Sequence, residues 1–170
     1  MKVAITGHTS GLGKALFDLF SIGNQVTGFS RSNGYDIRNF KKIVDRIHGY
    51  DIFINNAYDK YSQIDLLREV FLIWQDQSKT IINISSLASS NLKSLTTKQV
   101  SQYSVHKAAL DAQVHQLQML QKKCRIINLR PGYFGQDKID VNVLAKLFNV
   151  ICSASFSNFS SPFSSLYKPF

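Results

Sequence analysis

The chain has 170 residues, a length that suits one domain, and its 44% hydrophobic and 18% charged residues provide for a packed core and exclude wholesale disorder. Lysine and arginine total 20 against 11 acidic residues, and the resulting net charge of +9 favours anionic partners. The basic residues are scattered, without a stripe of interleaved aromatic residues, so a nucleic-acid partner is not expected.

The sequence also does not predict a membrane span, a signal peptide or a cysteine metal site. No apolar run reaches the about 18 residues that a membrane-spanning helix needs, so a membrane partner is not expected. The first residues lead directly into a glycine-rich turn, which does not resemble a signal peptide. The two cysteines, Cys124 and Cys152, indicate reduced thiols of a cytoplasmic protein, and their spacing does not suit a metal site.

The first part of the chain alternates short apolar runs with helical spacing. Residues 2–6 are predicted to form a strand, and residues 11–20 a helix, because apolar residues recur there at helical intervals. A second strand is expected at residues 25–29. Apolar residues at helical intervals then predict a helix over 39–48, and the run DIFIN predicts a third strand at 51–55.

The same alternation continues toward the C-terminus. A helix rich in Leu, Val and Phe is expected at 65–75, followed by a fourth strand at 80–85. A long helix is predicted at 103–122, a fifth strand at 125–130 and a final helix at 141–152.

Buried strands that alternate with helices are typical of an α/β fold. We therefore expect a Rossmann-like, doubly wound parallel sheet, abbreviated in length, with helices on both faces. This domain is expected to span residues 1–152. Residues 153–170 form a separate tail rich in serine and phenylalanine, to which we assign no chemistry.

The turn between the first strand and the first helix, TGHTSGLG at residues 6–13, is a candidate dinucleotide-binding turn. Gly7 permits a tight turn, Gly11 lets the backbone approach a pyrophosphate, and Gly13 allows close packing of the helix on the strand. The helix N-terminus offers free N–H groups to the phosphates. The alternative is a glycine-rich turn that binds no ligand. The candidate binding residues here are Gly7, Thr9, Ser10, Gly11, Leu12 and Gly13.

Arg31 follows the second strand, where a cofactor with a free ribose 2′-OH usually meets an acidic residue. A guanidinium can instead hold a 2′-phosphate with two hydrogen bonds. We therefore expect NADP(H) in preference to NAD(H). The alternative is a solvated arginine on a loop.

Tyr103 and Lys107 are four residues apart at the start of a predicted helix, so they share one helix face. A tyrosine keeps its proton near neutral pH unless a nearby positive charge favours the phenolate, which is what an acid/base group for an alcohol or ketone needs. Ser86 follows the fourth strand, and a serine there can hydrogen-bond a substrate carbonyl oxygen. Taken alone, the pair is also compatible with an ordinary helix surface.

Together these residues resemble the short-chain dehydrogenase/reductase family. The matching motifs occur in the family's order over residues 1–152: TG-x3-G-x-G from Thr6, NNA from Asn55, NISS from Asn83, Tyr103-x3-Lys107, and Pro131-Gly132. The resemblance implies a Rossmann fold and a nicotinamide cofactor. It also implies that Tyr103 is the proton donor or acceptor, that Lys107 assists it and binds the nicotinamide ribose, and that Ser86 orients the carbonyl.

The resemblance implies further cofactor contacts. Asp36 and Ile37 resemble the acidic and apolar pair that flanks the adenine, and Asn56 and Ala57 would line the cofactor cleft. Pro131-Gly132 would cover the nicotinamide. The helices predicted at 65–75 and 103–122 correspond to the helices that pair between subunits in members of the family. The resemblance therefore suggests a homodimer or homotetramer.

The chain departs from the family's pattern at several places. It is shorter than the usual member, Tyr58 replaces the glycine that normally follows Asn-Asn-Ala, and the family's catalytic asparagine has no clear match. These losses fall mostly where substrate specificity is built. We therefore expect an oxidoreductase that moves a hydride between NADP(H) and a carbonyl or alcohol substrate. The alternative is a catalytically weak or inactive protein that binds NADP(H) as a sensor or scaffold.

Overall fold

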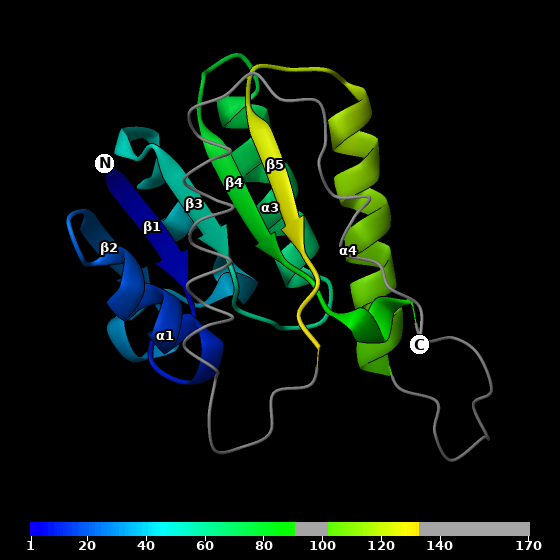
Figure 1. Ribbon diagram of the computed structural model, residues 1–170, viewed down its shortest axis with the longest axis horizontal. Helices are drawn as coiled ribbons and strands as arrows, with labels where there is room; N and C mark the ends of the chain where they lie inside the picture. The colour runs from blue at the N-terminus through cyan, green and yellow to red at the C-terminus, as the bar shows by residue number, and fades with distance from the viewer. Residues whose placement is uncertain (91–101, 133–170) are drawn as a thin grey trace. The chain divides into compact units, whose positions relative to one another are not determined.

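The computed structural model describes residues 1–90 and 102–132, and all of them belong to one compact unit, Met1–Lys138. Five parallel strands form its sheet in the order β2-β1-β3-β4-β5 (Figure 1). Their bounds are β1 Lys2–Thr6, β2 Gln25–Phe29, β3 Ile52–Asn55, β4 Thr80–Ile84 and β5 Arg125–Leu129. The predicted helix at 141–152 and the predicted boundary after residue 152 lie outside the described residues.

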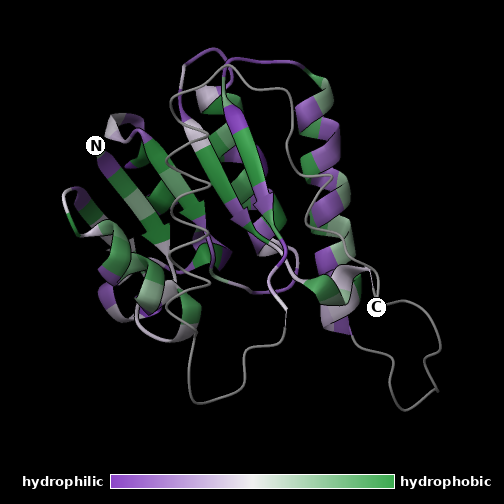
Figure 2. Cartoon of the chain, viewed as in Figure 1, coloured by the Kyte–Doolittle hydropathy of each residue, from purple (hydrophilic) through white to green (hydrophobic). Residues whose placement is uncertain are grey.

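The strands form where the sequence has short runs of Ile, Val and Phe, which suit a sheet covered on both faces. All four residues of β3 are buried, as are the last four of β1 and of β4. In Figure 2, β1 and β3 are coloured as hydrophobic along most of their length. The prediction of a doubly wound parallel sheet is therefore confirmed.

Among the described residues, three long helices cover the sheet: α1 (Gly11–Phe20), α3 (Ser62–Trp74) and α4 (Gln102–Met119). Because the chain passes from β1 outward to β2, but from β3 in the opposite direction to β4 and β5, right-handed crossovers put α1 on one face and α3 and α4 on the other. Figure 1 shows α1 in front of the sheet and α3 behind it. α3 begins three residues before the predicted helix, and α4 ends before residue 122.

The prediction of one helix over 39–48 was wrong. The structure has three short turns instead: the 3-10 turns η2 (Ile37–Asn39) and η3 (Ile47–Gly49), with α2 (Lys41–Val44) between them. The backbone tightens through i→i+3 hydrogen bonds, such as that from the Arg46 N–H to the Ile43 carbonyl. The apolar spacing still predicted burial, since Ile43 and Ile47 are fully buried.

One continuous core joins the sheet to α3 and α4. Trp74, Phe53 and Phe71 are among its largest fully buried side chains, and the indole ring of Trp74 packs edge-on to Phe53. Within residues 1–90 and 102–132, no helix has both the length and the apolar character needed to cross a membrane.

Candidate active site

A cavity of about 550 Å³ lies at the carboxyl ends of β1, β2 and β3. The strand order reverses between β1 and β3, and α/β sheets bind ligands at this kind of switch point. The volume lies within the range of small-molecule sites. The predicted cofactor residues that line this cavity are Gly7, Thr9, Ser10, Leu12, Gly13, Arg31, Asp36, Ile37, Asn56 and Ala57.

The glycine-rich turn has the backbone geometry that only glycine adopts easily. Gly7 has φ +70° and Gly11 has φ +52°, both in the left-handed region. A Cβ on Gly13 would lie 2.0 Å from the carbonyl oxygen of Gly7, so a side chain there is excluded by the backbone itself. Gly11 is the one predicted residue of this turn that is not among those lining the cavity, although a Cβ built there would meet no atom within 4 Å apart from its chain neighbours and its own helix.

Thr6 and Asn56 join this turn to the end of β3. The Thr6 hydroxyl accepts hydrogen bonds from the N–H groups of Asn56 and Ala57, each at 3.0 Å. In return, the Asn56 side-chain amide donates to the carbonyls of Thr6 at 3.0 Å and Gly7 at 3.3 Å. The floor of the cavity is therefore held by hydrogen bonds within the protein, independently of a ligand.

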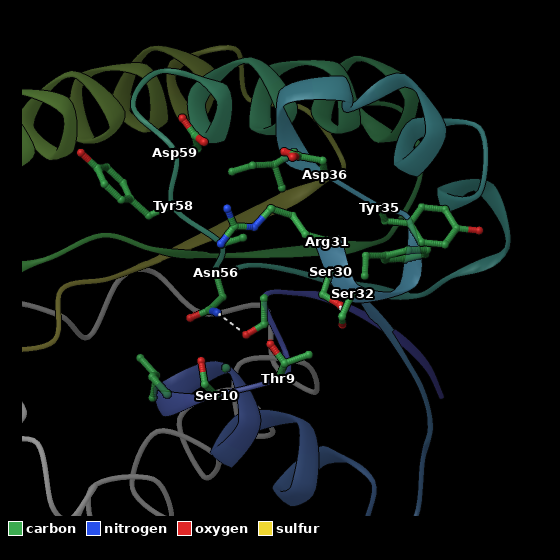
Figure 3. Close-up of a pocket in the computed structure, with 16 residues that line it drawn as sticks. Thr9, Ser10, Ser30, Arg31, Ser32, Tyr35, Asp36, Asn56, Tyr58 and Asp59 are labelled. Carbon is green, nitrogen blue, oxygen red and sulfur yellow. Dashed lines mark hydrogen bonds between the residues drawn. The ribbon is translucent and has the colours of Figure 1, made fainter.

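Arg31 extends over the cavity, with its guanidinium between Asn56 and Tyr58 (Figure 3). Its guanidinium forms no ion pair with any side chain in the described parts of the chain. Ser30 and Ser32, which also line the cavity, share a hydrogen bond of 2.8 Å between their hydroxyls. This wall therefore offers an arginine that is available to an anion.

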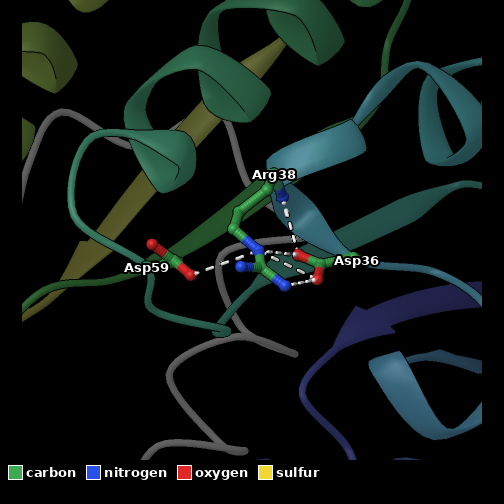
Figure 4. Close-up of polar contacts among 3 residues, drawn as sticks. All are labelled: Asp36, Arg38 and Asp59. Carbon is green, nitrogen blue, oxygen red and sulfur yellow. Dashed lines mark hydrogen bonds and ion pairs between the residues drawn. The ribbon is translucent and has the colours of Figure 1, made fainter.

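Asp36 lines the same cavity, but its carboxylate is already occupied by Arg38 (Figure 4). The Arg38 side chain donates to both carboxylate oxygens, and its backbone N–H donates to one of them at 2.9 Å. These hydrogen bonds lower the pKa of Asp36 to about 2. The Arg38 Nε also lies 3.6 Å from Asp59, a second acidic residue of the cavity wall.

Lys107 and Tyr103 lie on α4, outside the residues that line the cavity. Lys107 is 3% exposed, and its Nζ donates to the Gln63 side-chain oxygen and to the Ile84 carbonyl, each at 2.8 Å. Burial lowers the pKa of Lys107 to about 8. Its Nζ lies 5.6 Å from the centre of the Tyr103 ring, and Tyr103 is 38% exposed.

Tyr58 connects the cavity with the Tyr103–Lys107 pair. It lines the cavity, and its ring packs edge-on to Tyr103 with the ring centres 4.9 Å apart. The Lys107 Nζ lies 5.4 Å from the centre of the Tyr58 ring, and the Tyr58 hydroxyl is hydrogen-bonded to Nδ1 of His106 at 2.8 Å. Burial is the main cause that raises the pKa of Tyr58. A side chain thus occupies the place where the sequence resemblance expected a glycine.

The remaining predicted residues form a third group beside α4. Ser86 precedes the 3-10 turn η4 (Leu87–Ser89), which packs against α4, and its hydroxyl accepts a hydrogen bond from the Ala88 N–H at 3.2 Å. The Pro131 carbonyl accepts from the Leu87 N–H at 3.0 Å, and a Cβ on Gly132 would touch the Leu87 side chain. Ser86 and Pro131-Gly132 are therefore neighbours through Leu87.

The sequence interpretation missed three residues that shape this site. Arg38 stands two positions after Asp36, so a local ion pair was readable from the sequence. Tyr58 was noticed only as a departure from a motif, and its contact with His106 depends on the fold. No local pattern pointed to Gln63, because its partner Lys107 is 44 positions away in the chain.

No group of three or more His, Cys, Asp or Glu side chains that could hold a metal ion occurs in the described segments 1–90 and 102–132. That the protein binds no metal stays a prediction.

Comparisons with known proteins identify the fold. No family model matches the sequence, and no curated protein matches it. A solved structure of 4-hydroxyisoleucine dehydrogenase complexed with NADH matches with TM-score 0.72 and 18% identity, over 92% of each chain. A short-chain dehydrogenase/reductase family oxidoreductase from Brucella ovis, in complex with a partially ordered NAD, matches with TM-score 0.68 and 18% identity, over 92% of this chain and 95% of that one.

A third match is a short-chain dehydrogenase from Burkholderia cenocepacia J2315 in complex with NADP, with TM-score 0.63 and 16% identity. It covers 80% of this chain and 73% of that one. At these identities the likeness concerns the fold. The parallel sheet, the glycine-rich turn at its switch point and these likenesses show that the chain has the fold of the short-chain dehydrogenase/reductases.

Proposed function

We propose that this chain is an NADP(H)-dependent oxidoreductase that interconverts a carbonyl compound and an alcohol, with Tyr103 as the general acid/base. The observation that carries the proposal is the position of Tyr58, which lines the cavity and also contacts Tyr103. The Tyr103–Lys107 pair therefore adjoins the cavity in which a nucleotide would bind. The related folds that were solved with NADP, NAD or NADH support a nicotinamide cofactor.

The residues of the cavity fit a phosphorylated dinucleotide. The N–H groups of the first turn of α1, where Leu12 and Gly13 line the cavity, suit the pyrophosphate. Arg31, which has no acidic partner in the described segments, suits a 2′-phosphate on the adenosine ribose. Asn56 and Ala57 would line the cleft, and Pro131-Gly132 would cover the nicotinamide. The bound cofactor would supply or accept the hydride.

The chain's own residues would handle the oxygen of the substrate. Ser86 accepts its capping hydrogen bond from Ala88, so the hydrogen of its hydroxyl remains available for the substrate's carbonyl oxygen. Tyr103 would deliver the proton to that oxygen in reduction and remove it in oxidation. The Lys107 ammonium stands 5.6 Å from the Tyr103 ring centre, so both residues of the pair would lie beside the substrate oxygen.

The direct experiment measures NADPH oxidation with a panel of carbonyl compounds, together with the Kd of NADPH and NADH. We expect wild-type turnover and NADPH binding about tenfold tighter than NADH, because one additional ion pair is worth about 1.4 kcal/mol. Tyr103→Phe is expected to lower kcat by at least about a hundredfold and to leave the Kd of NADPH unchanged.

The matched control is Tyr61→Phe, which removes a phenol hydroxyl from an exposed tyrosine near the start of α3. This variant is expected to keep the wild-type rate. Equal turnover by wild type and Tyr103→Phe would refute the role given to Tyr103.

A second candidate function is NADP(H) binding without turnover, and the contacts of Lys107 favour it. The Tyr58 ring covers the Lys107 ammonium, which also donates to Gln63 and Ile84. A contact between Lys107 and a cofactor ribose therefore requires the Tyr58 ring to move. Tight NADPH binding by wild type with no oxidation on the panel, together with turnover by Tyr58→Gly, would identify this case. Steady wild-type turnover would eliminate it.

A further inference from the structure

Four charged side chains meet at the wall of the cavity opposite the glycine-rich turn. Arg31, Asp36 and Asp59 line the cavity, whereas Arg38 binds the two carboxylates from beside it (Figure 4). Asp36 and Arg38 come from the connection between β2 and β3, and Asp59 comes from the loop after β3. With Arg38 in place the four charges balance. Without it, the two carboxylates would leave this wall with a net negative charge.

The strongest contacts of Arg38 are to Asp36. The Arg38 Nε lies 3.1 and 3.0 Å from the two carboxylate oxygens, its Nη2 bonds to the second oxygen, and the Arg38 backbone N–H holds the first. The same Nε lies 3.6 Å from Asp59, so one guanidinium serves two acidic residues. Arg38 is therefore the electrostatic partner of both acidic residues of the wall.

Among the described residues that line the cavity, Arg31 is the one cation. Without Arg38, the Asp36 and Asp59 carboxylates would be drawn toward Arg31. Its charge already contributes to the low pKa of Asp36. If Arg38 were removed, Asp36 would lose its partner and would compete with any bound anion for the Arg31 guanidinium. The two free carboxylates would also repel an anion directly.

We propose that Arg38 is a specificity-determining residue: by binding Asp36 and Asp59, it keeps Arg31 available for a phosphate monoester on the ribose of an adenosine ligand. The inference rests on the proposed function and assigns part of the preference for a 2′-phosphate to a residue that does not line the cavity. A phosphate monoester carries close to two negative charges near neutral pH, so it senses these carboxylates more strongly than a ribose hydroxyl does.

The test compares the binding of two probes by titration calorimetry at low ionic strength: adenosine 2′,5′-bisphosphate and adenosine 5′-monophosphate. Wild type is expected to bind the bisphosphate more tightly. Arg38→Met is expected to weaken bisphosphate binding by about five- to tenfold and monophosphate binding by less than about twofold, because the released charges act chiefly on the 2′-phosphate. Arg68→Met, which removes an exposed arginine paired with Glu69 on α3, is the matched control and is expected to bind as wild type does.

A rescue variant separates electrostatics from damage to the fold. In Arg38→Met/Asp36→Asn/Asp59→Asn, the carboxylates are gone, so the ratio of bisphosphate to monophosphate affinity is expected to return to within about twofold of wild type, whereas loss of an Asp36 contact with the adenine would weaken both probes alike. Asp36→Asn/Asp59→Asn alone is expected to prefer the bisphosphate over the monophosphate at least as strongly as wild type does. This variant also tests the inference if Arg38→Met does not fold.

Three results would overturn the inference: unchanged bisphosphate selectivity in Arg38→Met, no rescue of that selectivity in the folded triple variant, or a weaker preference for the bisphosphate in the double variant. A wild-type protein that binds neither probe contradicts the proposed function itself. The two failures can be told apart. If the proposed function holds and only the role of Arg38 is wrong, wild type binds the bisphosphate but the variants do not respond as described.

Discussion

Lys107 is a buried cation that is held by neutral groups. No carboxylate lies within ion-pair distance of its Nζ in the part of the chain that the structure describes. Instead, the Gln63 side-chain oxygen and the Ile84 carbonyl accept its hydrogen bonds. The Gln63 amide cannot turn round, because its NH2 group donates to the carbonyls of Asn55 at 2.8 Å and Ile84 at 3.0 Å. Its oxygen must therefore face Lys107.

This environment predicts a dependence of stability on pH. The pKa of Lys107 falls from 10.5 to about 8 on folding because burial disfavours the charged form. The folded state then binds fewer protons than the unfolded state, so this cost is fully present below pH 8 and is relieved as the pH rises toward 10.5. Between pH 7 and 10, wild type should gain about 2 kcal/mol of unfolding free energy relative to Lys107→Met.

Urea denaturation at the two pH values measures this difference. Trp74 is the one tryptophan of the chain and is fully buried, so its fluorescence reports on unfolding. Lys14→Met removes an exposed lysine that pairs with Asp18 on α1, and it should show no comparable change between the two pH values. A gap between wild type and Lys107→Met that is the same at pH 7 and pH 10 would contradict the assignment.

At the scale of elements, the turn between β1 and α1 depends on the missing side chain of Gly13. The Gly7 carbonyl would lie 2.0 Å from a Cβ at position 13, and the Asn56 side-chain nitrogen 2.5 Å from it. Neither group is free to move, since Asn56 holds the turn and the Gly7 N–H donates to the Phe29 carbonyl at 2.8 Å. Close packing of α1 on β1 therefore requires glycine.

Gly13→Ala is expected to destabilise the protein by more than about 3 kcal/mol and to abolish nucleotide binding, because the backbone must shift. Gly49→Ala is the matched control, since no atom lies within 4 Å of a Cβ there, and it should change stability by less than about 1 kcal/mol. Denaturant titration and NADPH binding are the measurements. Near-wild-type stability of Gly13→Ala would show that the turn is looser than described.

At the scale of the whole molecule, a chain of side-chain amides crosses the sheet. Asn55, Asn83 and Asn128 stand in register on β3, β4 and β5. Asn55 donates to Asn83 at 3.0 Å, Asn83 donates to Asn128 at 2.8 Å, and Asn128 donates to the Asp111 carboxylate on α4 at 2.8 Å. Because a carboxylate only accepts, Asp111 sets the direction of every amide in the chain.

The same chain of contacts continues to the Tyr–Lys pair. The Asn55 amide also donates to the Gln63 backbone carbonyl at 3.0 Å, and Gln63 holds Lys107, which lies one turn before Asp111 on α4. The polar contacts therefore pass through three strands and two helices and return to the helix on which they began. Asp111 also pairs with Arg130, which directly precedes Pro131-Gly132.

Asn83→Leu should lower the unfolding free energy by about 2–4 kcal/mol, because it leaves the Asn55 donor and the Asn128 acceptor without their partner in the sheet. Asn39→Ala, at an exposed position, should change it by less than about 0.5 kcal/mol. Urea denaturation measures each change. A loss below about 0.5 kcal/mol for Asn83→Leu would mean that the amide chain contributes little to stability.

The sequence alone predicted much of this fold, since all five strands appeared within one residue of their predicted ends. Apolar runs of four or five residues between turns are a local signal. In a sheet covered on both faces every residue of a strand is buried, so the strand appears in the sequence as such a run. The helix predicted at 39–48 was wrong because its apolar spacing specified which residues are buried, but not whether the backbone between them forms one helix or three short turns. The pairing of α3 and α4 between subunits stays a prediction.

By itself, the sequence determined the parallel α/β arrangement and the glycine-rich turn, because each depends on residues that are close along the chain. Only the tertiary structure decided which side chains from different elements come into contact. Gln63 reaches Lys107, Tyr58 reaches Tyr103 and His106, and Arg38 holds Asp59 as well as Asp36. Most of these partners are tens of positions apart, and their contacts follow from the crossovers that bring the carboxyl ends of the strands together.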